Sequence, residues 1–152
     1  MSEIKTKMDE IIPLIKERLS AGYEVSFSPS GTSMLPFIKE GRDSVTLVAP
    51  PKRLKKYDLP LYQRDNGQYV LHRVVGVGQT YTCIGDSQFV LEKGIKQEQI
   101  IALCVAITKN GKKRSVYSFW SQFSARIWHY SRFPRRIILA VKRRILAIFS
   151  KK

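Results

Sequence analysis

The segment YDLPLYQRDNGQYVLHRVVGVG, residues 57–78, carries the clearest structural pattern in the chain. Two runs rich in aromatic and β-branched residues flank the polar sequence RDNGQ, whose Asn66-Gly67 pair favours a tight two-residue turn. The pattern predicts an antiparallel β-hairpin. On both sides of it the chain continues as short apolar runs separated by turn residues, so we expect the hairpin to belong to a larger sheet.

Roughly six to eight short strands are expected between residues 25 and 117. Besides the hairpin they fall in the runs GYEVSFS, SVTLVA, TYTCIGD, SQFVLEKG and IIALCVAITKNGKKRSVYSF, the last of which turns at Asn110-Gly111. Many short strands with turn signals between them are typical of β domains. We therefore expect a mostly β fold, built as a coiled antiparallel sheet or a partly open barrel.

Residues 1–24 are expected to form an N-terminal helical segment. Apolar residues recur there at helical spacing, although Pro13 argues for a kink or a break. They are Ile4, Met8, Ile11, Ile12, Ile15 and Leu19. The segment mixes acidic and basic residues and has no apolar h-region, so we expect no secretory signal. No window of the chain reaches the roughly 18 uninterrupted apolar residues that a spanning helix needs.

The positive charge of the chain is concentrated near its end. The formal net charge is +15, yet residues 1–108 hold 14 Lys and Arg against 12 Asp and Glu. Residues 109–152 hold 13 Lys and Arg and no carboxylate. Such an imbalance indicates an anionic partner for the tail.

Residues 118–152 are expected to form a basic amphipathic helical tail. Aromatic and aliphatic residues recur at helical spacing on both sides of Pro134, with most Arg and Lys away from them. The apolar set is Val116, Trp120, Phe123, Ile127, Tyr130, Ile138, Val141, Ile145 and Ile148. This composition is typical of a helix lying in a membrane interface. We therefore expect a peripheral membrane protein that binds anionic lipid, and we expect it on the cytoplasmic face of the membrane rather than on the opposite face.

The tail has two alternatives to a membrane surface. Its helices could pack on the domain or on a protein partner. Its Arg and Lys could instead grip the phosphates of a nucleic acid, with aromatic side chains stacking on bases. Nucleic-acid binding does not account for the rise in aliphatic content toward the last residue, so we place the membrane surface first.

The residue types needed for acyl transfer are present, but their spacing alone does not identify a site. Ser33 lies in the turn-like run SPSGTSMLPFI, His72 in a strand and Asp86 after a glycine at a strand end. A serine nucleophile needs a base within hydrogen-bond reach, and the only other histidine is His129, in the tail. Each position is therefore equally consistent with a purely structural role.

The two cysteines, Cys83 and Cys104, lie in apolar runs and are expected to be buried free thiols. No Cys and His residues cluster at metal-ligand spacing, so we expect no metal or other cofactor.

Four sequence boxes occur in the order of a known family, with YDLPLYQ standing where that family has a further strand. SPSGTSMLPFI resembles the G-x-S-M-x-P box of type I signal peptidases, and KEGRDSVTLV resembles their next Gly-Asp strand, with Arg42 inserted between Gly41 and Asp43. YDLPLYQ, YVLHRVVGV and IGDSQF follow in the family order over roughly residues 25–107. Bacterial leader peptidases and SOS repressors, which share the signal peptidase–LexA-like fold, use a lysine base. The histidine at position 72 resembles the endoplasmic-reticulum-type branch.

The resemblance assigns roles to individual residues. It implies Ser33 as nucleophile and His72 as general base, with Asp86 as the orienting acid and Glu92 in reserve. It also implies an oxyanion hole and substrate groove, made of Gly31, Thr32, Met34 and Pro36.

We accordingly expect a serine endopeptidase that cleaves a peptide or protein precursor at a membrane surface, with residues 25–117 as its β domain. The resemblance does not extend to the family's N-terminal membrane anchor. The alternatives are a catalytically inactive, membrane-associated binding module of the same fold and a basic nucleic-acid-binding protein.

Overall fold

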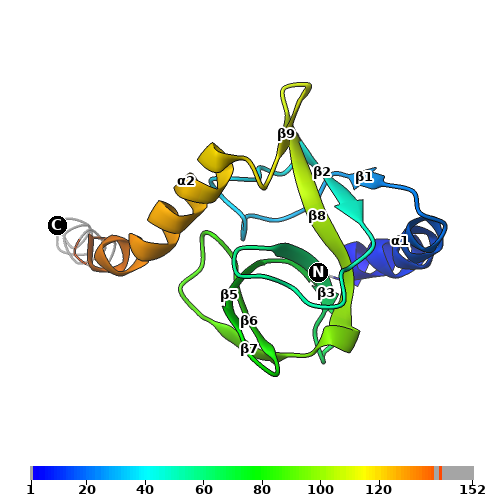
Figure 1. The fold of residues 1–152 in the computed structure, drawn as a ribbon, viewed down its shortest axis with the longest axis horizontal. Coiled ribbons are helices and arrows are strands. Elements are labelled where there is room, and N and C mark those ends of the chain that lie inside the picture. Colours follow the sequence, from blue (N-terminus) through cyan, green and yellow to red (C-terminus); the bar gives the residue numbers. More distant parts are fainter. Residues whose placement is uncertain (1, 139–140, 142–152) are drawn as a thin grey trace, which may run out of the picture.

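The computed structural model describes the backbone of residues 2–138 and 141, and the side chains among them from residue 8 onward. It combines helices with antiparallel sheets (Figure 1). The elements are α1 (Ser2–Ser20), β1 (Val25–Phe27), β2 (Asp43–Val48), β3 (Leu59–Gln63), β4 (Tyr69–Leu71), β5 (Arg73–Val77), β6 (Tyr81–Ile84), β7 (Glu92–Ile95), η1 (Gln97–Gln99), β8 (Ile100–Lys109), β9 (Lys112–Ser115) and α2 (Phe119–Tyr130). Residues 132–138 are also helical.

The hairpin predicted at Asn66-Gly67 is confirmed. Strands β3 and β4 pair antiparallel, with Leu61 opposite Leu71. The turn is closed by hydrogen bonds between Arg64 and Gln68 at 2.8 Å and between Gly67 and Arg64 at 2.9 Å. Gly67 has a φ of 81°, which glycine adopts without steric cost.

The strands form two antiparallel sheets. The first has the order β1-β2-β8-β3-β4, with β9 also paired to β8, and the second has the order β5-β6-β7. The expected antiparallel pairing is confirmed, but the two sheets do not join into a closed barrel within the described residues. With helices at both ends of the described chain, the architecture is mixed rather than purely β.

Helix α1 is continuous through Pro13 and belongs to the main core. Its Ile12, Ile15 and Leu19 are buried in the same cluster as the inward-facing residues of β2, β3 and β8. Burying an aliphatic side chain contributes roughly 1.5–3 kcal/mol. Three such side chains outweigh the roughly 3 kcal/mol that an interior proline costs, which explains why the expected break does not occur.

The two cysteines are buried free thiols, as predicted. Cys104 belongs to the main core, and Cys83 belongs to a second cluster that lies under β5, β6 and β7. Burial raises the pKa of each thiol to about 12. Neither is therefore a nucleophile at neutral pH.

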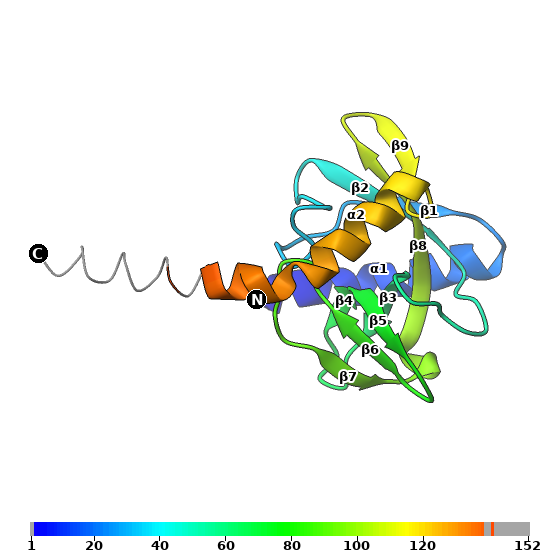
Figure 2. The ribbon, with the colours of Figure 1, turned by 60° about the vertical axis from the view of Figure 1, so that its left-hand side comes forward.

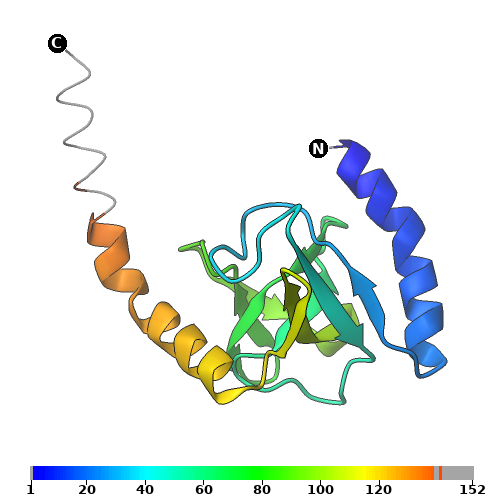
Figure 3. The ribbon, with the colours of Figure 1, turned by 90° about the horizontal axis from the view of Figure 1, so that it is seen from above.

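The helices at the two ends of the chain flank the loop that carries Ser33. Figure 3 shows α1 and the C-terminal helices projecting to one side of the sheets, with the loop 28–42 between them. Figure 2 shows α2 running across the domain and the helical residues 132–138 continuing beyond it. Within the described residues no helix has the length and apolar character needed to cross a membrane. The predicted positions Ile145 and Ile148 lie outside these residues.

Candidate active site

His72 lies where the chain leaves the first sheet and enters the second. It follows Leu71, the last residue of β4, and precedes Arg73, the first residue of β5. Its side chain is 1 % exposed, and its Nδ1 lies 2.9 Å from Oε1 of Glu92, the first residue of β7. The two sheets thus meet at a buried imidazole and a partly buried carboxylate.

Two other side chains hold the Glu92 carboxylate in this position. The Tyr62 hydroxyl donates to Oε2 at 2.8 Å, and Nε of Arg64 donates to the same oxygen at 2.9 Å. A second guanidinium nitrogen of Arg64 bonds Oε1, so the arginine grips both oxygens. The Tyr62 hydroxyl also lies 3.4 Å from Nδ1 of His72. The carboxylate therefore has a fixed orientation toward the imidazole.

The surroundings of Nδ1 determine which nitrogen of His72 carries the proton. An ionised carboxylate only accepts hydrogen bonds, and the single hydroxyl hydrogen of Tyr62 is donated to Glu92. Nδ1 must therefore be the protonated nitrogen of the neutral imidazole, which leaves Nε2 as an acceptor. This is the tautomer that a general base in serine catalysis needs.

Burial and these contacts also set the ionisation of the pair. Burial lowers the pKa of His72, and the charge of Glu92 opposes this effect only in part. Burial alone would raise the pKa of Glu92, but hydrogen bonds from Arg64 and Tyr62 outweigh it and hold that pKa below its usual value. At neutral pH the pair is a neutral imidazole beside an ionised carboxylate.

Asp86 is paired with Arg73 instead. Its two oxygens accept hydrogen bonds from Nε and Nη2 of Arg73 at 2.8 and 2.7 Å, and both residues are buried. From the sequence, Asp86 is expected before Glu92 as the acid beside His72; in the structure Glu92 is the carboxylate in contact with the imidazole. The physical reason is that the buried Arg73 needs a carboxylate to compensate its charge, and both oxygens of Asp86 serve that purpose.

The Asp86 segment also fixes the loop of Ser33. The Ser33 carbonyl accepts a hydrogen bond from the Ser87 N–H at 2.9 Å, and Ser87 Oγ donates to the Thr32 carbonyl at 2.8 Å. A β-carbon on Gly85 would lie only 2.7 Å from the Ser33 carbonyl oxygen. Glycine is therefore required there for the two segments to pack this closely.

Three backbone N–H groups around Ser33 are free to donate. Within the described residues the amides of Thr32, Ser33 and Met34 have no hydrogen-bond acceptor. The Gly31 N–H, in contrast, donates to Oε2 of Glu40 at 2.9 Å. Of the positions expected to form the oxyanion hole and groove, Thr32 and Met34 thus offer backbone donors and Gly31 does not; the N–H of Ser33 itself is a further donor.

Arg42, the residue inserted in the Gly-Asp box, closes the same loop at its far end. Its guanidinium donates to both oxygens of the buried Asp43 at 2.6 and 2.8 Å, and the Lys39 N–H adds a bond at 2.9 Å. The Arg42 hydrogen bond lowers the pKa of Asp43 against the effect of burial. The insertion therefore supplies the charge that lets β2 begin with a buried aspartate.

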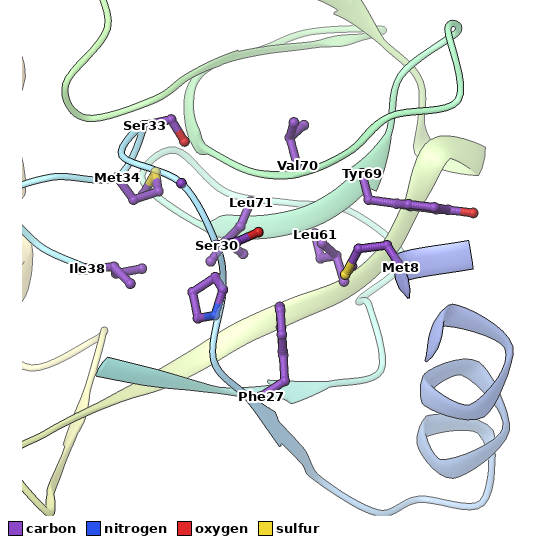
Figure 4. Close-up of a pocket in the computed structure, with 12 residues that line it drawn as sticks. Met8, Phe27, Ser30, Ser33, Met34, Ile38, Leu61, Tyr69, Val70 and Leu71 are labelled. Carbon is purple, nitrogen blue, oxygen red and sulfur yellow. The ribbon is translucent and has the colours of Figure 1, made fainter. Parts of the chain in front are cut away.

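A small apolar cavity of about 110 Å³ opens beside Ser33 (Figure 4). Its walls come from the Ser33 loop, from β3 and β4, and from α1 through Met8. The lining residues are Met8, Phe27, Pro29, Ser30, Gly31, Ser33, Met34, Ile38, Leu61, Tyr69, Val70 and Leu71. Met34 thus lines the cavity as expected from the sequence, whereas Pro36 is exposed and lies outside its lining.

Ser33 and His72 are not hydrogen-bonded to each other in the described part of the chain. Leu71 lines the cavity beside Ser33, whereas the next residue, His72, does not and instead contacts Tyr62 and Glu92. In enzymes without substrate such hydrogen bonds are often long and tighten only in the complex. The peptidase mechanism requires this hydroxyl–imidazole contact to form.

Helix α2 contacts both segments of the candidate site through Trp128. The indole N–H donates to the carbonyl oxygen of Asp86 at 2.7 Å, and the ring packs edge-on against Phe37 of the Ser33 loop, with 6.0 Å between centroids. The guanidinium of Arg135 lies 3.6 Å above the indole and donates to the Trp128 carbonyl. Trp128 therefore joins the tail to both segments of the candidate site.

His129, the second histidine, packs edge-on against Tyr57, with 6.1 Å between ring centroids. His129 directly follows Trp128 in α2 and therefore also contacts the β domain. Among the described residues no three His, Cys, Asp or Glu side chains gather closely enough to hold a metal ion.

Three contributors to the site are not identified from the sequence. Tyr62 has the pattern of a strand residue and Arg64 that of a turn residue, while Trp128 lies outside the apolar set predicted for the tail. The one signal is the alternation of β3, which places Tyr62 on a buried face, but no local pattern pairs it with Glu92.

The chain was compared with models of known protein families, with curated proteins and with solved structures, and none of them matched. Its function is therefore inferred from the chemistry of its own side chains.

Proposed function

We propose that the protein is a serine endopeptidase of the signal-peptidase type, with Ser33 as nucleophile, His72 as general base and Glu92 as the acid that orients the base. The observation that carries the proposal is the contact of the buried His72 with the partly buried Glu92, with 2.9 Å between Nδ1 and Oε1. A neutral imidazole with its proton on Nδ1 has a free Nε2 to take a proton from a serine hydroxyl.

The chemistry proceeds in two stages. Nε2 of His72 takes the hydroxyl proton as Ser33 Oγ forms a bond to the scissile carbonyl carbon, and Glu92 stabilises the imidazolium that results. The C–N bond then breaks, and the imidazolium returns the proton to the leaving amine. A water molecule, deprotonated by His72, then attacks the ester carbonyl. The bond to Ser33 Oγ breaks, the imidazolium returns the proton to Oγ, and the acid product is released.

The free backbone amides of Thr32 and Ser33 are the candidate donors to the oxyanion of the tetrahedral intermediate. A single donor of this kind contributes about 10²- to 10³-fold to kcat in other serine peptidases. General base catalysis by a positioned histidine adds about 10²- to 10⁴-fold.

The substrate is an extended peptide with a small apolar side chain next to the scissile bond. The apolar cavity beside Ser33 is small, about 110 Å³, which suits a short side chain. Strand β4 is the last strand of the first sheet, and its Tyr69 and Leu71 line this cavity. A peptide added to that free edge would gain backbone hydrogen bonds while placing one side chain in the cavity.

The test is cleavage of a mixture of unstructured peptides, followed by mass spectrometry. We expect cleavage after small apolar residues by the wild-type protein and none by Ser33→Ala or His72→Ala. Ser28→Ala is the matched control, since Ser28 is an exposed serine in the same segment, and it should cleave at the wild-type rate. Equal cleavage by Ser33→Ala would show that another group is the nucleophile.

A second candidate function is a binding module of the same fold that does not cleave. The missing Ser33–His72 hydrogen bond in the described residues favours this alternative. It predicts that peptides bind to wild-type and Ser33→Ala proteins with the same affinity and that neither protein cleaves them. Isothermal titration with the tightest-binding peptide of the mixture separates the two functions.

A further inference from the structure

Helix α2 has two apolar faces, and only one of them is used by the domain. On the inner face Ala125 is 2 % exposed, and Trp128 bonds the Asp86 carbonyl. Gln122, on the same face, donates to the Val116 carbonyl at 2.8 Å. These positions recur at three-residue spacing, so they define the side of α2 that lies on the domain.

The outer face of α2 carries large apolar side chains that contact solvent. Trp120 is 74 % exposed, and its ring packs with its helical neighbours Phe119 and Phe123. The helical residues 132–138 carry further exposed apolar side chains. We define the outer stripe as Phe119, Trp120, Phe123, Ile127, Tyr130, Phe133, Ile137, Ile138 and Val141, all exposed. Soluble proteins rarely leave a contiguous apolar surface of this kind without a partner.

The outer stripe lies within a strongly basic segment. No Asp or Glu occurs after Glu98, whereas 13 Lys and Arg occur from residue 109 onward. Arg126 and Arg136 are exposed, and Arg132 is partly exposed, between members of the stripe. The partner must therefore be apolar and anionic at the same surface.

These observations distinguish between the classes of partner. A second copy of the chain would bring another basic tail against the first, at a repulsive electrostatic cost. A nucleic acid offers phosphates and bases but no apolar layer for Ile127, Ile137 and Val141. The interface of an anionic bilayer offers lipid phosphates for Arg, an interfacial layer for Trp and Tyr, and acyl chains for the aliphatic residues.

We propose that the outer stripe lies in the interface of an anionic lipid bilayer, with α2 and residues 132–138 parallel to the membrane and the inner face of α2 turned toward the domain. The bilayer thereby holds the Ser33 loop at a fixed place beside its surface, because Trp128 joins α2 to that loop and to Asp86. The inference concerns where the protein acts and does not require Ser33 to be a nucleophile.

The test is flotation of the full-length protein with vesicles. The probes are vesicles of phosphatidylcholine alone and vesicles in which about a third of the lipid is phosphatidylglycerol. We expect binding to the anionic vesicles, weakened as salt is raised because exposed charges are screened. The double variant Trp120→Ala/Phe123→Ala should bind at least about tenfold more weakly. The matched control, Leu14→Ala/Tyr23→Ala, removes exposed apolar side chains outside the tail and should bind like the wild type.

Tryptophan fluorescence tests the orientation directly. Trp120 is exposed and Trp128 is partly buried against the domain, so a blue shift on adding anionic vesicles should come from Trp120 and vanish in Trp120→Phe. Equal vesicle binding by Trp120→Ala/Phe123→Ala and the wild type would overturn the proposal, because the attachment would then be electrostatic only. Loss of a dimer in that variant, without any vesicle binding by the wild type, would also overturn it and assign the stripe to a second copy. Peptide cleavage measured without vesicles is independent of all these outcomes.

Discussion

Nδ1 of His72 and Oε1 of Glu92 lie 2.9 Å apart, in a contact that joins the turn between β4 and β5 to the start of β7. Asp86, the acid that the resemblance implies first, has both oxygens bonded to Arg73. The two carboxylates therefore have different partners: Glu92 contacts a neutral imidazole, and Asp86 compensates the charge of the buried Arg73. This difference predicts different phenotypes for their substitution.

We expect Glu92→Gln to lower kcat strongly while the protein remains folded. The amide cannot stabilise the imidazolium, and its NH₂ group cannot accept the proton of Nδ1. Loss of the equivalent carboxylate in serine peptidases costs about 10⁴-fold in kcat. The measurement is kcat on a peptide that the wild type cleaves. Glu24→Gln, which removes an exposed carboxylate paired with Lys113, is the control and should keep the wild-type rate. A wild-type kcat in Glu92→Gln combined with loss of activity in a folded Asp86→Asn would assign the orienting role to Asp86.

When kcat/KM is plotted against pH, its decrease on the acid side should have a midpoint below pH 6.5. Burial lowers the pKa of His72 from its ordinary value of about 6.5. Since only the neutral imidazole takes a proton, kcat/KM falls as the pH drops through that lowered pKa. In Glu92→Gln this midpoint should move to still lower pH, because the charge of Glu92 raises the pKa of His72. A midpoint above pH 7 would contradict this assignment of the base.

The same pKa shift predicts a pH dependence of stability. Between the lowered pKa of folded His72 and about 6.5, the unfolded chain binds more protons at this residue than the folded chain does. Its contribution to the free energy of unfolding is therefore complete above that window and is lost as the pH falls through it. Urea unfolding at several pH values should show a shallower dependence over this window in His72→Gln than in the wild type. An unchanged dependence would mean that His72 is not buried in its neutral form.

The Arg73–Asp86 pair should matter for stability more than any exposed pair. Both residues are buried, and Asp86→Asn leaves the charge of Arg73 uncompensated. Removing one partner of a buried pair costs about 3–5 kcal/mol. Urea unfolding should show a loss of this order, compared with about 0–1 kcal/mol for Lys113→Ala at the exposed pair with Glu24. A loss as small as that of Lys113→Ala would indicate that Arg73 finds water or another acceptor in the variant.

The hairpin can be predicted from the sequence, whereas the carboxylate that contacts His72 cannot. The reason is physical. The Asn66-Gly67 turn is encoded by adjacent residues, and its strands follow from local alternation. The contact of Glu92 with His72 depends on how β7 pairs with β6, where Glu92 lies opposite Cys83 after a register shift between Tyr81 and Cys83. No local pattern encodes such a shift, so the sequence favours the more familiar Gly-Asp position of Asp86.

The structure of the tail can also be predicted only in part. The apolar spacing of Trp120, Phe123 and Ile127 is visible in the sequence and is confirmed as one helical face. Which face meets the domain is decided instead by the small Ala125 and by the indole hydrogen bond of Trp128 to Asp86. Neither feature contributes to a hydrophobic periodicity, so periodicity alone leaves open whether the larger stripe packs on the domain.

Trp128 and Trp120 should separate catalysis from membrane binding. Trp128→Phe keeps an aromatic ring against Phe37 but loses the N–H bond to Asp86, a contact of about 1 kcal/mol. Because the Asp86–Ser87 segment holds the Ser33 carbonyl, we expect Trp128→Phe to lower kcat in solution several-fold and to leave vesicle flotation unchanged. Trp120→Ala should weaken flotation and leave kcat in solution unchanged, since its ring packs with Phe119 and Phe123 on the outer face. If both variants lowered flotation and kcat together, α2 would act as one structural unit, and Trp128 would have no separate role in positioning the Ser33 loop.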